Sequence, residues 1–190
     1  GQSGADDVAS GCFTGIHIVE REVLELVPEN RFCGMVDPIY ARLLEERVPL
    51  HGQVVSGSWY EIGTPDRYIS CQLEALHCEE FPLAFEGYQR IRPGGYVRGL
   101  VGPLPAGISP PFMIDKQVKL EEASLISGVV IGSEAYVDRG ASVLNSVLMK
   151  RAKIGAGAYV ERCIILEDGV VPSGARCVNQ VIAPEVLKKT

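Results

Sequence analysis

Apolar residues recur every seventeen positions through the C-terminal half of this 190-residue chain. Each period holds three of them, spaced six, six and five residues apart. The three series are Ile114, Ile131, Leu148, Ile165, Ile182; Leu120, Val137, Ile154, Val171; and Ile126, Val143, Val160, Cys177. An α-helix or a coiled coil returns to one face after about 3.6 or 3.5 residues, so neither explains a step of six. The pattern favours a three-sided solenoid in which each side of each coil turns one apolar side chain inward.

A second regularity supports the solenoid. Two positions before most of these apolar residues stands a small one: Ala135, Ala141, Ser146, Ala152, Ala158, Cys163, Gly169 and Ala175. The segments IGSEAY, VDRGAS, IGAGAY and VPSGAR resemble the hexapeptide-repeat proteins over about residues 112 to 183. That resemblance implies a left-handed parallel β-helix. The handedness comes from the resemblance alone, because most parallel crossovers are right-handed and spacing does not encode the hand.

Charge and hydropathy exclude several classes of partner. The chain carries 18 basic and 24 acidic residues, a net charge of −6, which argues against a nucleic-acid or bilayer surface. No apolar stretch approaches the roughly 20 residues that span a membrane, and the first residues lack the pattern of a secretory signal. We therefore expect a cytoplasmic protein with no nucleic acid and no membrane as partner.

The cysteines indicate free thiols. Six are present, at positions 12, 33, 71, 78, 163 and 177, with no CxxC pair and no histidine at metal-ligand spacing. Cys163 and Cys177 fall on solenoid positions, which predicts that both are buried as small apolar groups. A structural zinc site is not expected.

The first 80 residues predict part of an α/β domain. Strands are expected at 13–19, 51–57 and 58–62, and helices at 20–27, at 36–48 with Asp37 as cap, and at 64–80 with Thr64 as cap and Pro65 at the first position. These elements are too few to cover both faces of an α/β sheet. We infer the C-terminal portion of a larger domain, completed by an upstream part, a second chain or a dimer mate.

Residues 81–111 and 112–190 complete the expected organisation. Many Pro and Gly residues in 81–111 predict a linker with one short strand near 96–100. Residues 112–190 hold the β-helix and a short polar tail that could cap its open end. The expected fold class is thus an α/β portion followed by a left-handed parallel β-helix.

The segment WYEIGTPDRY, at 59–68, is the sharpest local motif. Together with FTGIHIV, VDPIYARLLEERVPL and the trailing solenoid, it resembles the C-terminal half of sugar-1-phosphate nucleotidyltransferases, the NDP-sugar pyrophosphorylases, whose α/β domain is Rossmann-like. Mannose-1-phosphate guanylyltransferases and glucose-1-phosphate thymidylyl- or adenylyltransferases share this order of elements. The resemblance implies that NTP and a sugar 1-phosphate give NDP-sugar and pyrophosphate. Guanine with mannose 1-phosphate is the first expectation, with glucose 1-phosphate next, and base selection depends on the absent half.

The resemblance assigns roles to four residues. In the family motif W-x-D-I-G-T-P, Glu61 stands where an Asp helps hold the catalytic Mg²⁺, a hard cation that takes oxygen ligands. Glu61 could equally be a surface carboxylate beside a helix N-terminus, where the helix dipole favours it. Thr14 and Gly15 match the strand that lies against the sugar phosphate, where a glycine lets a ligand approach the backbone, although a packing role for Gly15 is an alternative. Trp59 is expected in the substrate pocket wall or in the core.

The sequence also departs from the family. It contains no Gly-rich nucleotide loop, G-x-G-x-R, and lacks the upstream Asp and Lys of the site, so the chain alone is expected to be inactive. An alternative is a catalytically inactive scaffold or regulatory subunit of the same fold, assembled as a homo-oligomer through its solenoid. A hexapeptide acyltransferase is disfavoured, because such enzymes use a His as base and His17, His51 and His77 all precede the solenoid.

Overall fold

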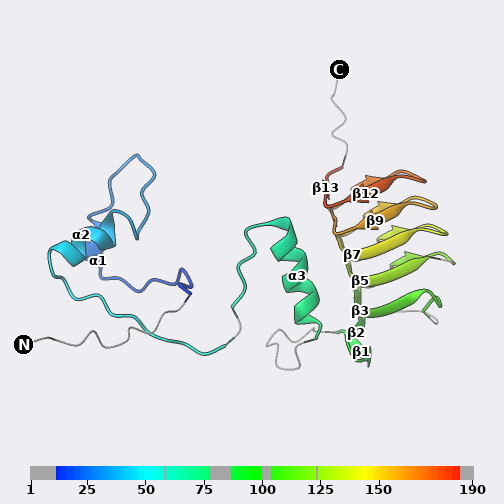
Figure 1. The fold of residues 1–190 in the computed structure, drawn as a ribbon, viewed down its shortest axis with the longest axis horizontal. Coiled ribbons are helices and arrows are strands. Elements are labelled where there is room, and N and C mark those ends of the chain that lie inside the picture. Colours follow the sequence, from blue (N-terminus) through cyan, green and yellow to red (C-terminus); the bar gives the residue numbers. More distant parts are fainter. Residues whose placement is uncertain (1–11, 58, 78–86, 100–103, 123, 185–190) are drawn as a thin grey trace, which may run out of the picture. The chain divides into compact units, whose positions relative to one another are not determined.

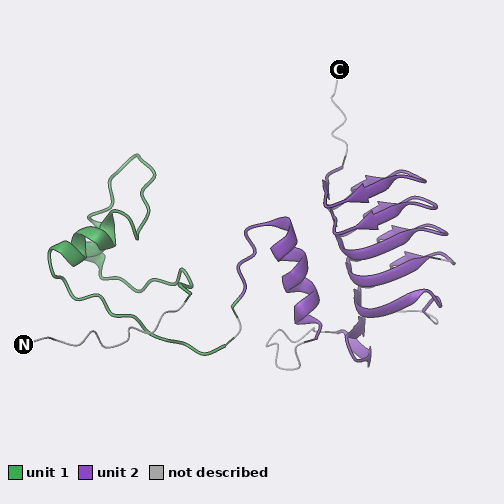
Figure 2. Cartoon of the chain, in the orientation of Figure 1, with its two compact units in different colours: residues 1–59 green, residues 60–190 purple. Residues whose placement is uncertain are grey.

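The computed structural model describes residues 12–57, 59–77, 87–99, 104–122 and 124–184 (Figure 1). The chain separates into two compact units, Gly1–Trp59 and Tyr60–Thr190 (Figure 2). The first unit holds helices α1 (Arg21–Leu24) and α2 (Ile39–Glu45), and the second holds helix α3 (Pro65–Ala75) and the strands. Cys78 and most of the C-terminal tail lie outside the described residues.

The strands of the second unit are short and follow one another closely. They are β1 (Gln89–Arg92), β2 (Gly95–Val97), β3 (Ile108–Ile114), β4 (Lys119–Leu120), β5 (Leu125–Ile131), β6 (Tyr136–Val137), β7 (Ser142–Leu148), β8 (Lys153–Ile154), β9 (Tyr159–Glu161), β10 (Ile164–Ile165), β11 (Val170–Val171), β12 (Arg176–Val178) and β13 (Val181–Ile182).

Parallel pairing at an offset of seventeen residues builds the solenoid. Ile114 pairs with Ile131, Ile131 with Leu148 and Ile165 with Ile182, so β3, β5, β7, β10 and β13 stack in order. Strands β4, β6, β8 and β11 form a second side, and β9 and β12 stack on the first half of β7 along a third. The predicted parallel β-solenoid is confirmed with its register, and its left-handed sense stays a prediction.

The interior is filled by the predicted apolar series. Ile126, Val137, Val143, Ile154, Val160, Ile165 and Val171 are each 0% exposed. The small residues expected beside them are buried too, except the half-buried Ala175, and among them Ser146 is also 0% exposed. Its hydroxyl donates to the carbonyl of Leu144 at 2.6 Å and accepts from the backbone N–H of Cys163 at 3.0 Å. Buried polar groups need such partners, so Ser146 stabilises the coil it sits in. The thiols of Cys163 and Cys177 are free and buried, as predicted.

The solenoid turns its corners on left-handed backbone conformations. One stack of corner residues is Gln117, Glu134, Arg151 and Asp168, with φ between 57° and 62°. Side chains at this corner form ion pairs from coil to coil: Arg151 Nε lies 2.7 Å from Asp168 Oδ1, and Lys150 Nζ lies 3.5 Å from Glu134. Opposite charges in register at exposed corners favour the seventeen-residue stacking modestly.

The solenoid sheet begins within the segment for which the sequence predicts a linker. Strands β1 and β2 form an antiparallel hairpin, and β2 pairs in parallel with β3, placing Gly95 opposite Phe112. A Cβ on Gly95 would come within 2.8 Å of the Phe112 ring, which is 0% exposed. Glycine at position 95 therefore lets the hairpin cover the end of the core.

The first unit forms less regular structure than its sequence predicts. No strand forms at 13–19, 51–57 or 59–62, so the described part of residues 1–80 does not show the expected α/β sheet. Ile18 is 99% and Val54 82% exposed, whereas Ile39 and Leu43 of α2 are buried. A strand needs a neighbour to accept its backbone hydrogen bonds, and the described residues of this unit contribute only one isolated bridge, Gly34 to Pro38.

Two helix predictions in this unit are corrected in detail. The cap of α2 is Pro38, with no side-chain hydrogen bond, because the helix begins one residue too late for the predicted cap Asp37 to reach its first amides. The helix expected at 20–27 is confined to Arg21–Leu24 and buries none of its residues. Within the described residues, no helix is long and apolar enough to cross a membrane.

Replacing Ile154 by Asp is predicted to unfold the solenoid. The Ile154 side chain is 0% exposed, so Ile154→Asp would place an unpaired carboxylate in a narrow apolar interior. We expect loss of the β-type circular dichroism, or a melting temperature at least about 10 °C lower. Lys153→Asp, at the exposed neighbouring position of β8, is the matched control and should melt close to the wild type. An unchanged melting temperature for Ile154→Asp would contradict the register.

Acidification is predicted to weaken the start of the solenoid through Asp115. Arg98 donates to both Asp115 oxygens, at 2.6 Å and 2.7 Å, and stacks on Tyr88. Partial burial raises the pKa of Asp115, but the hydrogen bonds from Arg98 and the backbone of Lys116 outweigh it and leave that pKa below its ordinary value. A lowered folded-state pKa gives stability that is present above the unfolded value of about 3.9 and is lost as pH falls through the folded value.

The measurement is the melting temperature from about pH 5 down to about pH 2. Asp115→Asn should melt lower than the wild type at pH 5, and the difference should shrink as the pH falls. Glu122→Gln, which removes an exposed carboxylate elsewhere on the solenoid, is the control and should keep the wild-type slope. Parallel slopes for Asp115→Asn and wild type would show that this ion pair contributes nothing.

Candidate functional site

The segment Glu61–Thr64 leads directly into helix α3, and the local sequence explains why the helix starts there. Thr64 has an extended backbone, and its hydroxyl accepts a hydrogen bond from the N–H of Arg67 at 3.3 Å. Pro65 occupies the first helical position, where its missing N–H is not needed. The predicted cap and start of this helix are confirmed, so the turn before it has a defined end.

Glu61 forms an ion pair with Arg67 across this turn. Both side chains are more than half exposed, at 58% for Glu61 and 56% for Arg67. The carboxylate is therefore available to a ligand, but a bound cation would have to compete with the guanidinium. Among the residues that the structure describes, no three acidic, histidine or cysteine side chains gather as a metal site.

The other three predicted site residues lie in the first unit. Thr14 is half-buried, and its hydroxyl accepts from the N–H of Ile16 at 3.5 Å. Gly15 is exposed with φ of 77°, a left-handed conformation that glycine adopts without strain, and nothing would touch a Cβ there. Trp59 is 44% exposed. Glu61 belongs to the second unit.

An aromatic cluster in the first unit was not foreseen. His17, predicted on a buried strand, is exposed, and its Nδ1 lies 2.5 Å from the hydroxyl of Tyr40. The ring of Phe13 stands edge-on to His17 at 5.1 Å. This contact ties the segment around Thr14 to α2 and gives it a place within its own unit.

The attachment of α3 to the solenoid was also missed. Ile69 of α3, which is 5% exposed, packs in one cluster with Val147 and Ile164, flanked by Tyr68, Leu73, Val130, Met149 and Leu166. In Figure 1, α3 runs alongside the stacked coils, and its contacts are with β5 and β7. The turn at Glu61–Thr64 is therefore joined to a helix that rests on the solenoid.

A signal for this attachment was present in the sequence. Directly before the inward series stands a second apolar series with the same spacing: Met113, Val130, Val147, Ile164 and Val181. Neighbouring residues of a strand point to opposite faces, so this series must point outward. An outward apolar stripe on one side of a solenoid predicts a covering element, and α3 is that element.

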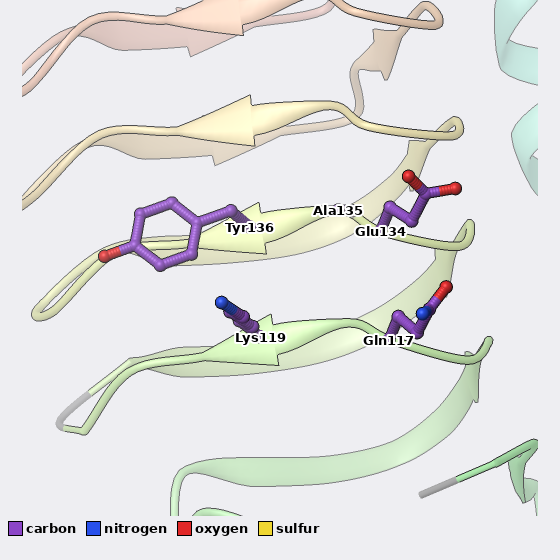
Figure 3. Close-up of a pocket in the computed structure, with 5 residues that line it drawn as sticks. All are labelled: Gln117, Lys119, Glu134, Ala135 and Tyr136. Carbon is purple, nitrogen blue, oxygen red and sulfur yellow. The ribbon is translucent and has the colours of Figure 1, made fainter.

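A shallow hollow on the outer surface offers little chemistry. It measures about 400 Å³ and is lined by Gln117, Lys119, Glu134, Ala135 and Tyr136 (Figure 3). Figure 3 shows Lys119 and Tyr136 on neighbouring coils, with Gln117 and Glu134 at the adjoining corner. The lining holds no histidine and no nucleophilic Ser or Cys, so it gives acyl transfer no support.

The sequence of this chain is similar to one family model and to several known enzymes. Residues 108–189 match the family model described as GMPPB C-terminal domain. The chain is 26% identical over 178 residues to the UTP–glucose-1-phosphate uridylyltransferase of a Synechocystis species, covering 92% of this chain and 46% of that protein. It is 27% identical over 162 residues to the glucose-1-phosphate adenylyltransferase of Corynebacterium diphtheriae, covering 77% and 36%. With that of Leifsonia xyli it shares 32% over 130 residues, covering 62% and 29%.

The resemblance to sugar-1-phosphate nucleotidyltransferases that the sequence predicts is thus confirmed. The chain spans less than half the length of these relatives, at 46%, 36% and 29%. What the whole protein does is therefore a matter of proposal.

Shortening Ile69 is predicted to release α3 from the solenoid. Removing a buried Ile side chain down to Ala costs about 2–5 kcal/mol, and α3 can detach without unfolding the coils. We expect trypsin to cut Ile69→Ala after Arg67, inside α3, at least about ten times faster than the wild type. The control is Ile62→Ala, whose side chain is 55% exposed, and its cleavage rate should not change. Equal rates for both variants would mean that the cluster does not hold the helix.

Proposed function

From the match of its solenoid to the GMPPB C-terminal domain and from its relatives, we propose that this chain is part of a sugar-1-phosphate nucleotidyltransferase. In the proposed reaction an oxygen of the sugar phosphate attacks the α-phosphorus of an NTP. The new P–O bond forms as the bond between the α-phosphorus and its bridging oxygen breaks, and pyrophosphate leaves. The products are an NDP-sugar and pyrophosphate.

One observation carries this proposal. The E-I-G-T-P turn and the solenoid belong to one compact unit, joined by α3. A solenoid alone occurs with many activities, and a short turn motif alone is a weak signal. Their combination, in a chain whose named relatives all transfer a nucleotidyl group to glucose 1-phosphate, favours the nucleotidyltransferase.

Within this enzyme we propose that Glu61 helps hold Mg²⁺ against the substrate phosphates. Mg²⁺ binds through one or two carboxylates together with phosphate oxygens and water, so a single carboxylate from this part of the chain is compatible with its coordination. The bound metal would neutralise phosphate charge. Arg67 holds Glu61 at the turn in the structure, and we propose that it orients the carboxylate. Thr14, Gly15 and Trp59 are proposed to bind the sugar phosphate.

The proposed substrates are a hexose 1-phosphate and an NTP. By their names, the relatives act on glucose 1-phosphate with UTP or with an adenylyl donor. Guanine with mannose 1-phosphate remains the expectation from the order of elements along the chain. A panel of NTPs against both sugar phosphates separates these possibilities.

A scaffold or regulatory subunit is the second candidate. The ion pair of Glu61 with Arg67 favours it, because the carboxylate already has a partner inside the chain. Val181 on the last strand of the solenoid is 48% exposed, and we propose that this end contributes to a homo-oligomer. Such a protein would assemble partners and form no NDP-sugar.

The proposed function is tested with the protein as its gene encodes it. Its intact mass is measured first, and pyrophosphate release is then followed with the substrate panel and Mg²⁺. Release that requires both an NTP and a sugar 1-phosphate supports the enzyme. No release from any pair, with the protein folded, would overturn the enzyme in favour of the scaffold.

Glu61→Gln is predicted to lower kcat at least about tenfold, because it removes a charged metal ligand. Glu61→Asp, which restores the family residue, should keep most of the activity. Lys153→Gln, on the exposed surface of β8, is the control and should behave as the wild type. Full activity of Glu61→Gln would show that Glu61 is not part of the site, and it would not contradict the proposed nucleotidyltransferase activity.

A further inference from the structure

Arg162 occupies a corner of the solenoid where the other residues of the same stack are glycine or asparagine. The seventeen-residue stack at this corner is Gly128, Asn145, Arg162 and Asn179, with φ of 64°, 45°, 51° and 54°. Glycine and asparagine adopt this left-handed conformation readily, and an arginine does so at some cost.

The side chain of Arg162 reaches from this corner to helix α3. Its Nη2 donates to Oδ1 of Asp66 at 3.0 Å, a contact between residues 96 positions apart. Asp66 lies in the first turn of α3, where a carboxylate is favoured by the helix dipole. Both side chains are about half exposed, at 52% and 62%, so the pair is a specific contact of modest strength.

The rest of α3 is held along the same side of the solenoid. One turn after Asp66, Ile69 enters the apolar cluster with Val147 and Ile164. Past the end of the helix, His77 lies against the turn between β1 and β2, where a Cβ on Gly94 would stand 3.6 Å from the His77 ring. An eleven-residue helix is about 16 Å long and strands lie about 4.8 Å apart, so α3 spans about three coils.

We infer that Arg162 is a positioning residue, which fixes the first turn of α3 and the turn Glu61–Thr64 before it on the solenoid. Few contacts separate Arg162 from Glu61, because Asp66, the partner of Arg162, adjoins Arg67, and Arg67 pairs with Glu61. Arg162 thereby sets where Glu61 can lie relative to the coils. That this placement serves a sugar-phosphate site rests on the proposed function.

The inference is tested by amide hydrogen exchange on the full-length protein. Arg162→Asn removes the guanidinium and installs the residue that the same corner carries at Asn145 and Asn179, so the solenoid should not be disturbed. We expect amides of α3 to exchange about two to five times faster, which is the range for losing an exposed ion pair, and solenoid amides to keep their rates. Arg139→Asn, an equal charge change at another exposed solenoid position, should leave α3 unchanged.

A charge reversal provides the rescue. Arg162→Asp and Asp66→Arg should each speed exchange in α3, and the double variant should be slower than either single variant. The comparison is with the single variants, because an arginine in the first turn of a helix is itself unfavourable. Additive effects of the two changes, or faster exchange spread evenly over the coils, would overturn the inference.

The effect of Arg162 on enzymatic activity is measured in a separate experiment. In the full-length protein, Arg162→Asn should lower kcat/KM for the sugar phosphate severalfold, and the reversal should recover part of it. An unchanged kcat/KM beside faster exchange in α3 would overturn the positioning of Glu61. If the wild type forms no NDP-sugar, the proposed function fails, and hydrogen exchange still decides whether Arg162 positions α3.

Discussion

Parallel backbone pairing between coils, at a fixed offset of seventeen residues, is the constraint on which the second unit depends. It puts Ile131 over Ile114 and Leu148 over Ile131, so one position repeats through the stack in the same surroundings. An inward side chain must then be apolar in every coil. A buried polar side chain such as Ser146 must form hydrogen bonds with neighbouring backbone groups. The same repetition lines up the outward residues, which is how an apolar stripe for α3 arises.

The described residues of the first unit, 12–57 and 59, have no comparable strand pairing. Its apolar side chains include Ile16, Ile18 and Phe32, which are 76%, 99% and 100% exposed. Burying such side chains would stabilise a fold by about 25 cal/mol for each Å² removed from water, but only against a surface of matching shape. Among the described apolar residues of this unit, Ile39 and Leu43 alone are fully buried.

The sequence allowed the solenoid to be predicted closely because its contacts are local and periodic. Ile154 and Val160 could be placed inside from spacing alone, and Thr64 could be assigned as a cap from its place before Pro65. The strand expected at 13–19 could not be settled in this way, because β-branched residues form a strand only beside a partner. The role of Arg162 was equally hidden, since its contact with Asp66 joins distant segments.

The length of α3 restricts the number of coils that can lie between its two end contacts. Its first turn meets the corner at Arg162, and His77, two residues past its end, lies against the hairpin turn at Gly94, so α3 and its short extension bridge those two points. Deleting a coil between them would move the corner by about 4.8 Å and break one of the two contacts. These two contacts place no constraint on the number of coils C-terminal to Arg162. Variation in solenoid length among related chains should therefore collect at the C-terminal end.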